Sequence, residues 1–164
     1  MAISEKVAEL LQQYKVKHDV LPHREVFTSQ ETAESVHVPG RMLAKVVVVR
    51  EPTGAYLMVV VPAACRVDLD LLASRTGRPG AVLVQETELR RLFPDCEVGA
   101  MPPLGRLYGM PMVVDRCIEK EPVLFFQAGN HHELVRMEMA AYLELARPIE
   151  GEFCVCGREA HAVS

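Results

Sequence analysis

Two runs of β-branched residues on either side of a Pro-Thr-Gly turn constrain the fold of this chain most strongly. Residues 45–62 read KVVVVREPTGAYLMVVVP, and Pro52 and Gly54 suit a tight connection between two strands. Both runs are apolar on both faces. The sequence therefore predicts a hairpin at the centre of the core, with helices on one side and the interior of a barrel on the other.

Helix and strand signals surround this hairpin. Ser4 precedes apolar residues spaced on one helical face, and Asp68 precedes a helix over 69–76 that ends at Gly77. Further helices are expected over 29–36, 86–93 and 133–146, the last one capped by Asn130. Further strands are expected over 81–85, 111–115 and 123–127.

The connections are too short and irregular for a doubly wound parallel sheet. They favour an α+β (mixed α/β) fold in which a largely antiparallel, barrel-like sheet is surrounded by helices. The 164 residues fit one domain, expected over 1–150, with a frayed tail over 151–164. The chain starts without a signal-peptide pattern, and its apolar segments fall short of the roughly 20 residues that cross a bilayer, so a cytoplasmic protein is expected.

Charge and cysteine usage exclude several function classes. The net charge of −4 excludes a protein that binds nucleic acid over a large basic surface. The many arginines still allow a local basic patch at a binding site. The five cysteines lack CxxC spacing, so reduced thiols are expected. Cys154 and Cys156 with His161 have ligand chemistry for zinc, but a reduced tail is the simpler interpretation, and neither a metal nor a cofactor is expected.

Several residues carry candidate chemistry. Lys45 begins an apolar run, so it is either a strand-end lysine with its amine in solvent or a functional cation whose anion Arg41 shares. His131 and His132 stand at an expected helix start, where a histidine serves as a cap partner or as a group beside a bound anion. His23 has the same two interpretations. The stiff loop over 98–105, VGAMPPLG, is either a tight connection or a main-chain receptor for a small polar substrate.

Five blocks of sequence, in order, resemble a known family. They read HREVFTSQETAE, LAKVVVV, LMVVVPAACRVDLDLLAS, VGAMPPLGRLYGMPMVVD and FFQAGNHHELVRMEMAAYLEL. The chain from about residue 3 to 145 resembles the YbaK-like aminoacyl-tRNA deacylases, which include the editing domains associated with prolyl-tRNA synthetase. The resemblance implies that family's barrel-like fold with helices around it. It also implies hydrolysis of the ester that joins a wrong amino acid to tRNA.

The resemblance also implies roles for particular residues. Lys45 matches a lysine that holds the terminal adenosine or phosphate of tRNA, and Gly99 and Pro103 match a G-x-x-x-P loop whose backbone faces the aminoacyl group. The catalytic residues expected on this basis are Lys45, Gly99, Ala100, His131 and His132. The substrate-binding residues expected are Met101, Pro102, Pro103, Gly129, Asn130, His23 and Arg41.

The implied partners are the acceptor end of mischarged aminoacyl-tRNA, of the tRNA(Pro) type, and prolyl-tRNA synthetase, with no membrane. Two alternatives remain open. One is a catalytically inactive module of the same fold that binds tRNA ends or nucleotides. The other is a hydrolase of small aminoacyl esters.

Overall fold

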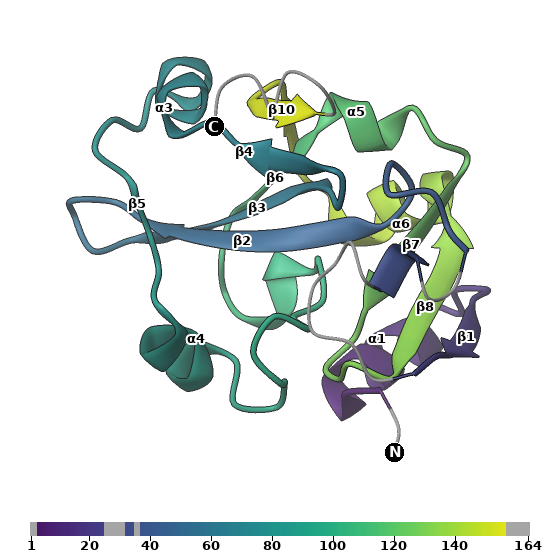
Figure 1. Ribbon diagram of the computed structural model, residues 1–164. Helices are drawn as coiled ribbons and strands as arrows, with labels where there is room; N and C mark the ends of the chain where they lie inside the picture. The colour runs from purple at the N-terminus through teal and green to yellow at the C-terminus, as the bar shows by residue number, and fades with distance from the viewer. Residues whose placement is uncertain (1–2, 25–31, 35–36, 157–164) are drawn as a thin grey trace.

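The computed structural model of the chain describes residues 3–24, 32–34 and 37–156. Three β-sheets and the helices around them make up the fold (Figure 1). The largest sheet has the strand order β5-β2-β3-β6-β9, formed by β5 (Val82–Leu83), β2 (Ala44–Arg50), β3 (Tyr56–Pro62), β6 (Met112–Asp115) and β9 (Ile149–Gly151). The predicted hairpin is confirmed, because β2 and β3 pair antiparallel at the middle of this sheet.

The other two sheets are smaller. One has the order β1-β8-β7, formed by β1 (Asp19–Pro22), β8 (Glu133–Glu138) and β7 (Val123–Gln127), and the other pairs β10 (Cys154–Cys156) with β4 (Cys65–Val67). A bridge between Leu43 and Phe125 joins the first of these to the start of β2. The mixed α+β class is confirmed, and five of the seven strand pairs are antiparallel. The sheets are not closed into one barrel.

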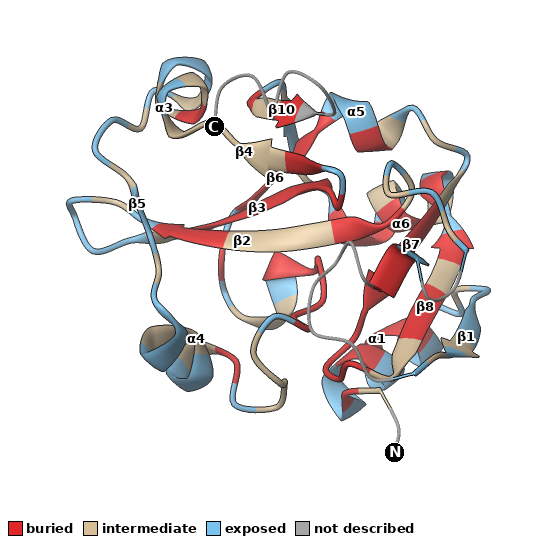
Figure 2. Ribbon diagram, viewed as in Figure 1, coloured by how far each residue is buried: buried red, intermediate tan, exposed pale blue. Residues whose placement is uncertain are grey.

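The helices cover both faces of the central hairpin (Figures 1 and 2). They are α1 (Glu5–Gln13), α3 (Leu69–Thr76), α4 (Glu86–Leu92), the 3-10 turn η1 (Gly105–Leu107), α5 (Arg116–Glu119) and α6 (Met139–Ala146). Val48 and Val60 face the core beside α1 and α6, whereas Val49 and Val59 face Leu72 of α3. Burial on both faces explains why the hairpin is apolar throughout. Among the described residues, each helix is too short or too polar to cross a lipid bilayer.

The expected helix over 133–146 is wrong in its first half. Residues 133–138 form β8, which pairs with β1 and β7, and only Met139–Ala146 is helical. In β8, Leu134 and Val135 are both fully buried. A short segment of apolar and β-branched residues is compatible with a strand between two partners as well as with a helix, so the sequence pattern does not distinguish them. Of the expected helix over 29–36, residues 32–34 are helical, and the others lie outside the described residues.

Residues 151–156, the described part of the expected tail, include strand residues. The expected domain boundary at residue 150 falls inside β9, and Cys154–Cys156 pair with β4, whereas residues 157–164 of the expected tail lie outside the described residues. The expectation of reduced thiols is also wrong at Cys65, which is disulfide-bonded, whereas Cys96, Cys117 and Cys154 carry thiols. The backbone register places Cys156 opposite Cys65. Spacing along the chain did not reveal this proximity, because a long excursion through the fold separates the two strands.

Candidate functional site

The loop over 98–105 is held in place by buried contacts. Met101 and Leu104 are buried in the main core, and the Tyr142 hydroxyl of α6 donates a 2.8 Å hydrogen bond to the carbonyl of Pro103. Pro102 and Pro103 restrict the backbone and are themselves buried. The loop is therefore a rigid platform and not a free connection.

The loop is joined to the turn after β7. The Gly129 amide donates to the carbonyl of Ala100 at 2.8 Å, and the Glu97 amide donates to the carbonyl of Gly129 at 2.8 Å. Gly129 has φ +113°, and a Cβ there would lie 3.2 Å from the Cβ of Ser4. Only glycine combines this conformation with this close approach. The structure thus brings two predicted segments, 98–103 and 128–132, into one unit.

His131 connects the same two segments through its side chain. Its amide donates to Glu97 Oε2 at 2.9 Å, and its Nε2 is 2.8 Å from the carbonyl of Val98, which accepts a hydrogen bond. Nδ1 then accepts from the Gln127 amide, at 3.4 Å. Both ring nitrogens are engaged and the residue is 3% exposed. His131 therefore acts as a strut that positions the loop.

Asn130 does not cap a helix, because β8 begins at Glu133. Its Oδ1 accepts hydrogen bonds from the amides of His132 (2.8 Å) and Glu133 (3.0 Å), and its Nδ2 lies 3.2 Å from Glu133 Oε1. An asparagine makes this pattern in a turn as well as at a helix start, so the expected helix cap is wrong and Asn130 instead stabilises the turn before β8. His132 and Glu133 are presented at the surface of this turn.

His23 and His132 line one open cavity of about 470 Å³, together with Pro22 and Glu133. The His23 amide donates to the carbonyl of His132 at 2.7 Å, which fixes β1 against the turn. His23 Nδ1 donates to the carbonyl of Arg24 at 2.6 Å. Nε2 is buried and has no hydrogen-bond partner among the described residues. With Nδ1 protonated, Nε2 is a lone-pair acceptor whose hydrogen-bonding capacity is unused by the described residues.

The amides of Gly99 and Ala100 differ in what they can offer a substrate. Ala100 is fully buried, and its amide donates to the carbonyl of Glu97 at 3.0 Å, within the loop's own turn. Gly99 is exposed with φ +87°, and its amide faces only the Met101 sulfur at 3.3 Å, a weak acceptor. Gly99 is thus the better placed donor of the two.

Lys45 and Arg41 lie apart from this unit. The Lys45 amine donates to the carbonyl of Cys65 on β4, and burial lowers the pKa of this amine while the nearby Cys154 acts in the opposite direction. Side chains alternate along β2, so Lys45 projects with Val47 toward the β4 and α3 face. The loop with Met101 packs on the opposite face. Arg41 forms a 2.9 Å ion pair with Glu121 instead of sharing an anion with Lys45.

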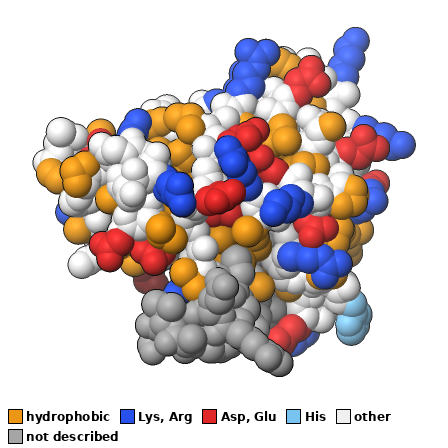
Figure 3. Space-filling view, turned by 90° about the horizontal axis from the view of Figure 1, so that it is seen from above, with side chains coloured by type: hydrophobic (Ala, Val, Ile, Leu, Met, Phe, Trp, Pro, Cys, Tyr) orange, Lys and Arg blue, Asp and Glu red, His pale blue; other side chains and the backbone are white. Residues whose placement is uncertain are grey.

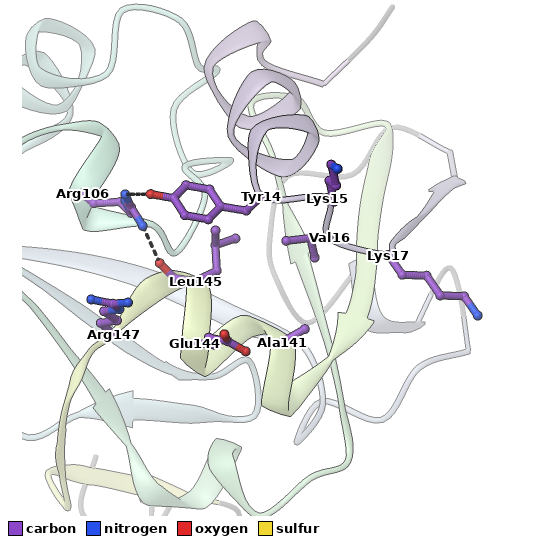
Figure 4. A pocket seen from close by; sticks show the side chains of 9 residues that line it. All are labelled: Tyr14, Lys15, Val16, Lys17, Arg106, Ala141, Glu144, Leu145 and Arg147. Atoms are coloured by element: carbon purple, nitrogen blue, oxygen red, sulfur yellow. Dashed lines mark hydrogen bonds between the residues drawn. The ribbon is translucent and has the colours of Figure 1, made fainter.

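A second cavity, of about 280 Å³, lies where the end of α1 meets the end of α6 (Figure 4). Arg106 lies over the Tyr14 ring, 4.9 Å from its centroid, and donates to the Tyr14 hydroxyl and to the carbonyl of Leu145. Four of the nine lining residues are cationic and one is acidic; the nine are Tyr14, Lys15, Val16, Lys17, Arg106, Ala141, Glu144, Leu145 and Arg147. This local basic cavity is compatible with the acidic net charge. Sequence reasoning missed its residues because Tyr14 and Arg106 are far apart in the chain.

The face seen in Figure 3 has a different charge pattern. Lys and Arg side chains are intermixed there with Asp and Glu side chains, and hydrophobic groups lie between them. Because charges of both signs are intermixed, this face does not favour the binding of a polyanion such as RNA, whereas a uniformly positive surface would.

Solved structures of other proteins share this fold. No curated protein sequence matches the chain. The structure described as "hypothetical protein APE2540" is 21% identical, with a TM-score of 0.82, over 92% of this chain and 100% of that one. A structure described as "a putative trans-editing enzyme for prolyl tRNA synthetase" is 21% identical, with a TM-score of 0.77, over 90% of this chain and 94% of that one.

A third structure, described as a "putative signal transduction protein" from Marinobacter aquaeolei VT8, is 21% identical with a TM-score of 0.72. It aligns over 94% of this chain but only 31% of its own. At such identities these similarities concern the fold. The sequence model of the aminoacyl-tRNA editing domain matches residues 23–145, a span that includes the loop, the turn and both cavity histidines. The chain belongs to the aminoacyl-tRNA editing domain family.

Proposed function

We propose that this protein is a YbaK-like deacylase that hydrolyses the ester of mischarged tRNA of the tRNA(Pro) type, in the cytoplasm and in cooperation with prolyl-tRNA synthetase. The observation that carries the proposal is the family match over residues 23–145, because it spans the Gly99 loop, the Gly129 turn and the His23 cavity that are joined in the fold. In this proposal residues 1–150 form the functional unit, and strand Cys154–Cys156 belongs to the same unit because it pairs with β4.

The chemistry needs few groups because an aminoacyl ester is already activated. The Gly99 amide stabilises the negative charge that develops on the ester carbonyl oxygen, and the rigid platform of Pro102 and Pro103 keeps that donor in place. His23 Nε2 accepts a proton from the attacking water, and His132 lies beside it in the same cavity. When the tetrahedral intermediate collapses, the bond between the carbonyl carbon and the ribose oxygen breaks, and the ribose oxygen takes the proton that His23 accepted, so the free amino acid departs. Pocket shape then decides which amino acid is admitted.

A second candidate function is a binding module that holds tRNA ends or nucleotides without turnover. One observation favours it: the Lys45 amine is engaged by the carbonyl of Cys65 on the face opposite the loop. A deacylase that uses Lys45 to hold the terminal adenosine requires that amine to leave its carbonyl partner and reach the 3′ end. Saturable binding of aminoacyl-tRNA without release of amino acid supports the module.

The test is a deacylation assay on a panel of tRNAs charged with near-cognate amino acids. For the full chain we expect release of amino acid from a subset of the panel. His23→Ala is expected to slow release about 100-fold by removing the proton acceptor. His18→Ala is the matched control, because His18 is an exposed histidine whose Nδ1 bonds the carbonyl of Val16. Equal rates for the parent and His23→Ala refute the role of that nitrogen.

Lys45→Ala separates the two arrangements of the site. If Lys45 holds the substrate, the variant no longer hydrolyses the charged tRNAs, while it still unfolds in the same cooperative transition as the parent. A variant that clears the panel at the parental rate refutes a role for Lys45. A short aminoacyl-adenosine tested beside full-length tRNA identifies a small-molecule esterase, because such an enzyme has no preference for the longer substrate.

A further inference from the structure

Three metal-ligating side chains from distant parts of the chain converge outside the site described above. Asp115 ends β6, Cys117 lies in α5 and Cys154 begins β10. One ligand atom from each lies within 4.8 Å of the other two. From the sequence, Cys154 is grouped with Cys156 and His161, and the folded chain instead places it beside a carboxylate and a thiol from residues 115–117.

Backbone hydrogen bonds build the cluster. Asp115 is 1% exposed and caps α5 by accepting from the Cys117 amide at 2.9 Å. Its other oxygen accepts from the amides of Phe153 (2.8 Å) and Cys154 (3.1 Å). One carboxylate therefore orients both thiol-bearing segments. The oxygen that caps α5 accepts one amide only and keeps lone-pair capacity for a further ligand.

We propose that Asp115, Cys117 and Cys154 form a site for a borderline-soft divalent cation, Zn²⁺ in the first place, with solvent in the fourth position. Two sulfurs at about 2.3 Å from zinc stand about 3.8 Å apart in tetrahedral geometry, and a carboxylate oxygen binds at about 2.0–2.2 Å. The observed separations, all within 4.8 Å, are close to those that this geometry needs. Cys117 is exposed and gives the ion a path from solvent.

The charges around the cluster also suit a bound cation. On binding, each thiol loses its proton to the solvent, so two thiolates and one carboxylate surround the ion with a net charge of −1 for the complex. The Lys45 ammonium, whose charge interacts with Cys154, offsets that charge. Without a cation, burial and the Asp115 carboxylate raise the pKa of both thiols.

The site would fasten the C-terminal strand to the body of the protein. Cys154 belongs to β10, whose strand partner among the residues that the structure describes is the three-residue β4. Cys117 belongs to the short helix that follows the central β6. A shared cation joins these two elements directly, independently of any activity on tRNA.

The experiment is a titration of the full chain with Co²⁺, in the absence of reductant so that the disulfide at Cys65 is kept. We expect one ion per chain, a thiolate-to-cobalt charge-transfer absorption, its loss when Zn²⁺ is added, and release of about two protons per ion. Zn²⁺ is also expected to raise the unfolding temperature. Cys117→Ser and Cys154→Ser are each expected to weaken binding about 100-fold or more, as loss of a ligand costs at least as much as loss of an outer-shell partner.

Cys96→Ser is the matched control, because Cys96 is a half-buried thiol near another carboxylate, Asp95, and is not in the cluster. It is expected to bind Co²⁺ like the parent. Because Cys117 is exposed, Cys117→Ser leaves the core intact and decides the matter even if Cys154→Ser fails to fold. The proposal is overturned if the parent shows no saturable 1:1 binding. It is equally overturned if Cys96→Ser loses binding, or if thiol counting finds Cys117 and Cys154 joined in a disulfide.

Discussion

Tyr142→Phe tests whether the loop over 98–105 is held by the contact that the structure identifies. Tyr142 is fully buried, and its hydroxyl donates to the carbonyl of Pro103 at 2.8 Å. Phenylalanine keeps the packing of the ring and removes only the hydroxyl. The lost hydrogen bond is worth about 1 kcal/mol net, and a buried carbonyl left without its partner raises the cost to about 1–3 kcal/mol.

The measurement is urea unfolding of the parent and the variant at equal protein concentration. A loss of about 2 kcal/mol in the free energy of unfolding lowers the unfolding temperature by about 4–8 °C in a chain of this size, with an unchanged dependence on urea. Tyr14→Phe is the matched control, because the Tyr14 hydroxyl bonds Arg106 at an exposed position, and we expect a loss below about 0.5 kcal/mol. If Tyr142→Phe loses no more than this control, the hydroxyl does not anchor the loop.

Two further predictions concern stability. Burial acts to raise the pKa of Asp95, but hydrogen bonds from the Ser4 and Tyr108 hydroxyls outweigh it and hold this pKa below its ordinary value. The resulting stabilisation is present above about pH 4 and is lost as the pH falls through the folded pKa, so Asp95→Asn should flatten the acid side of a stability-versus-pH curve. An unchanged curve contradicts this. Gly105→Ala places a Cβ 2.5 Å from the carbonyl oxygen of Met110 and should cost about 3 kcal/mol of unfolding free energy by calorimetry. Gly54→Ala, at φ +92° in open space, should cost only about 1 kcal/mol, and similar losses in the two variants refute the steric argument.

Part of the candidate site could be predicted from the sequence. The residues alone allow the loop to be a tight connection or a main-chain receptor, and the roles of the loop and the turn come from the family resemblance. The structure adds that the two segments are hydrogen-bonded to each other through Gly129. The separate roles of the histidines could not be predicted. Both ring nitrogens of His131 are engaged, whereas His23 Nε2 is buried without a partner among the described residues, and this difference depends on contacts with Val98 and Arg24. Residue type alone does not reveal such partners.

The sequence by itself determined the elements whose signals are local. The central hairpin follows from two apolar runs around a turn, and the helix after Asp68 follows from a cap and a closing glycine, both observed. Tertiary structure alone decided where short apolar segments pair and which way their side chains point. Residues 133–138 became a strand because β1 and β7 flank them, and Lys45 projects away from the Gly99 loop because of its parity along β2. The physical reason is that hydrogen bonds between strands, and contacts such as those of Cys154 with Asp115, are made by residues far apart in the chain.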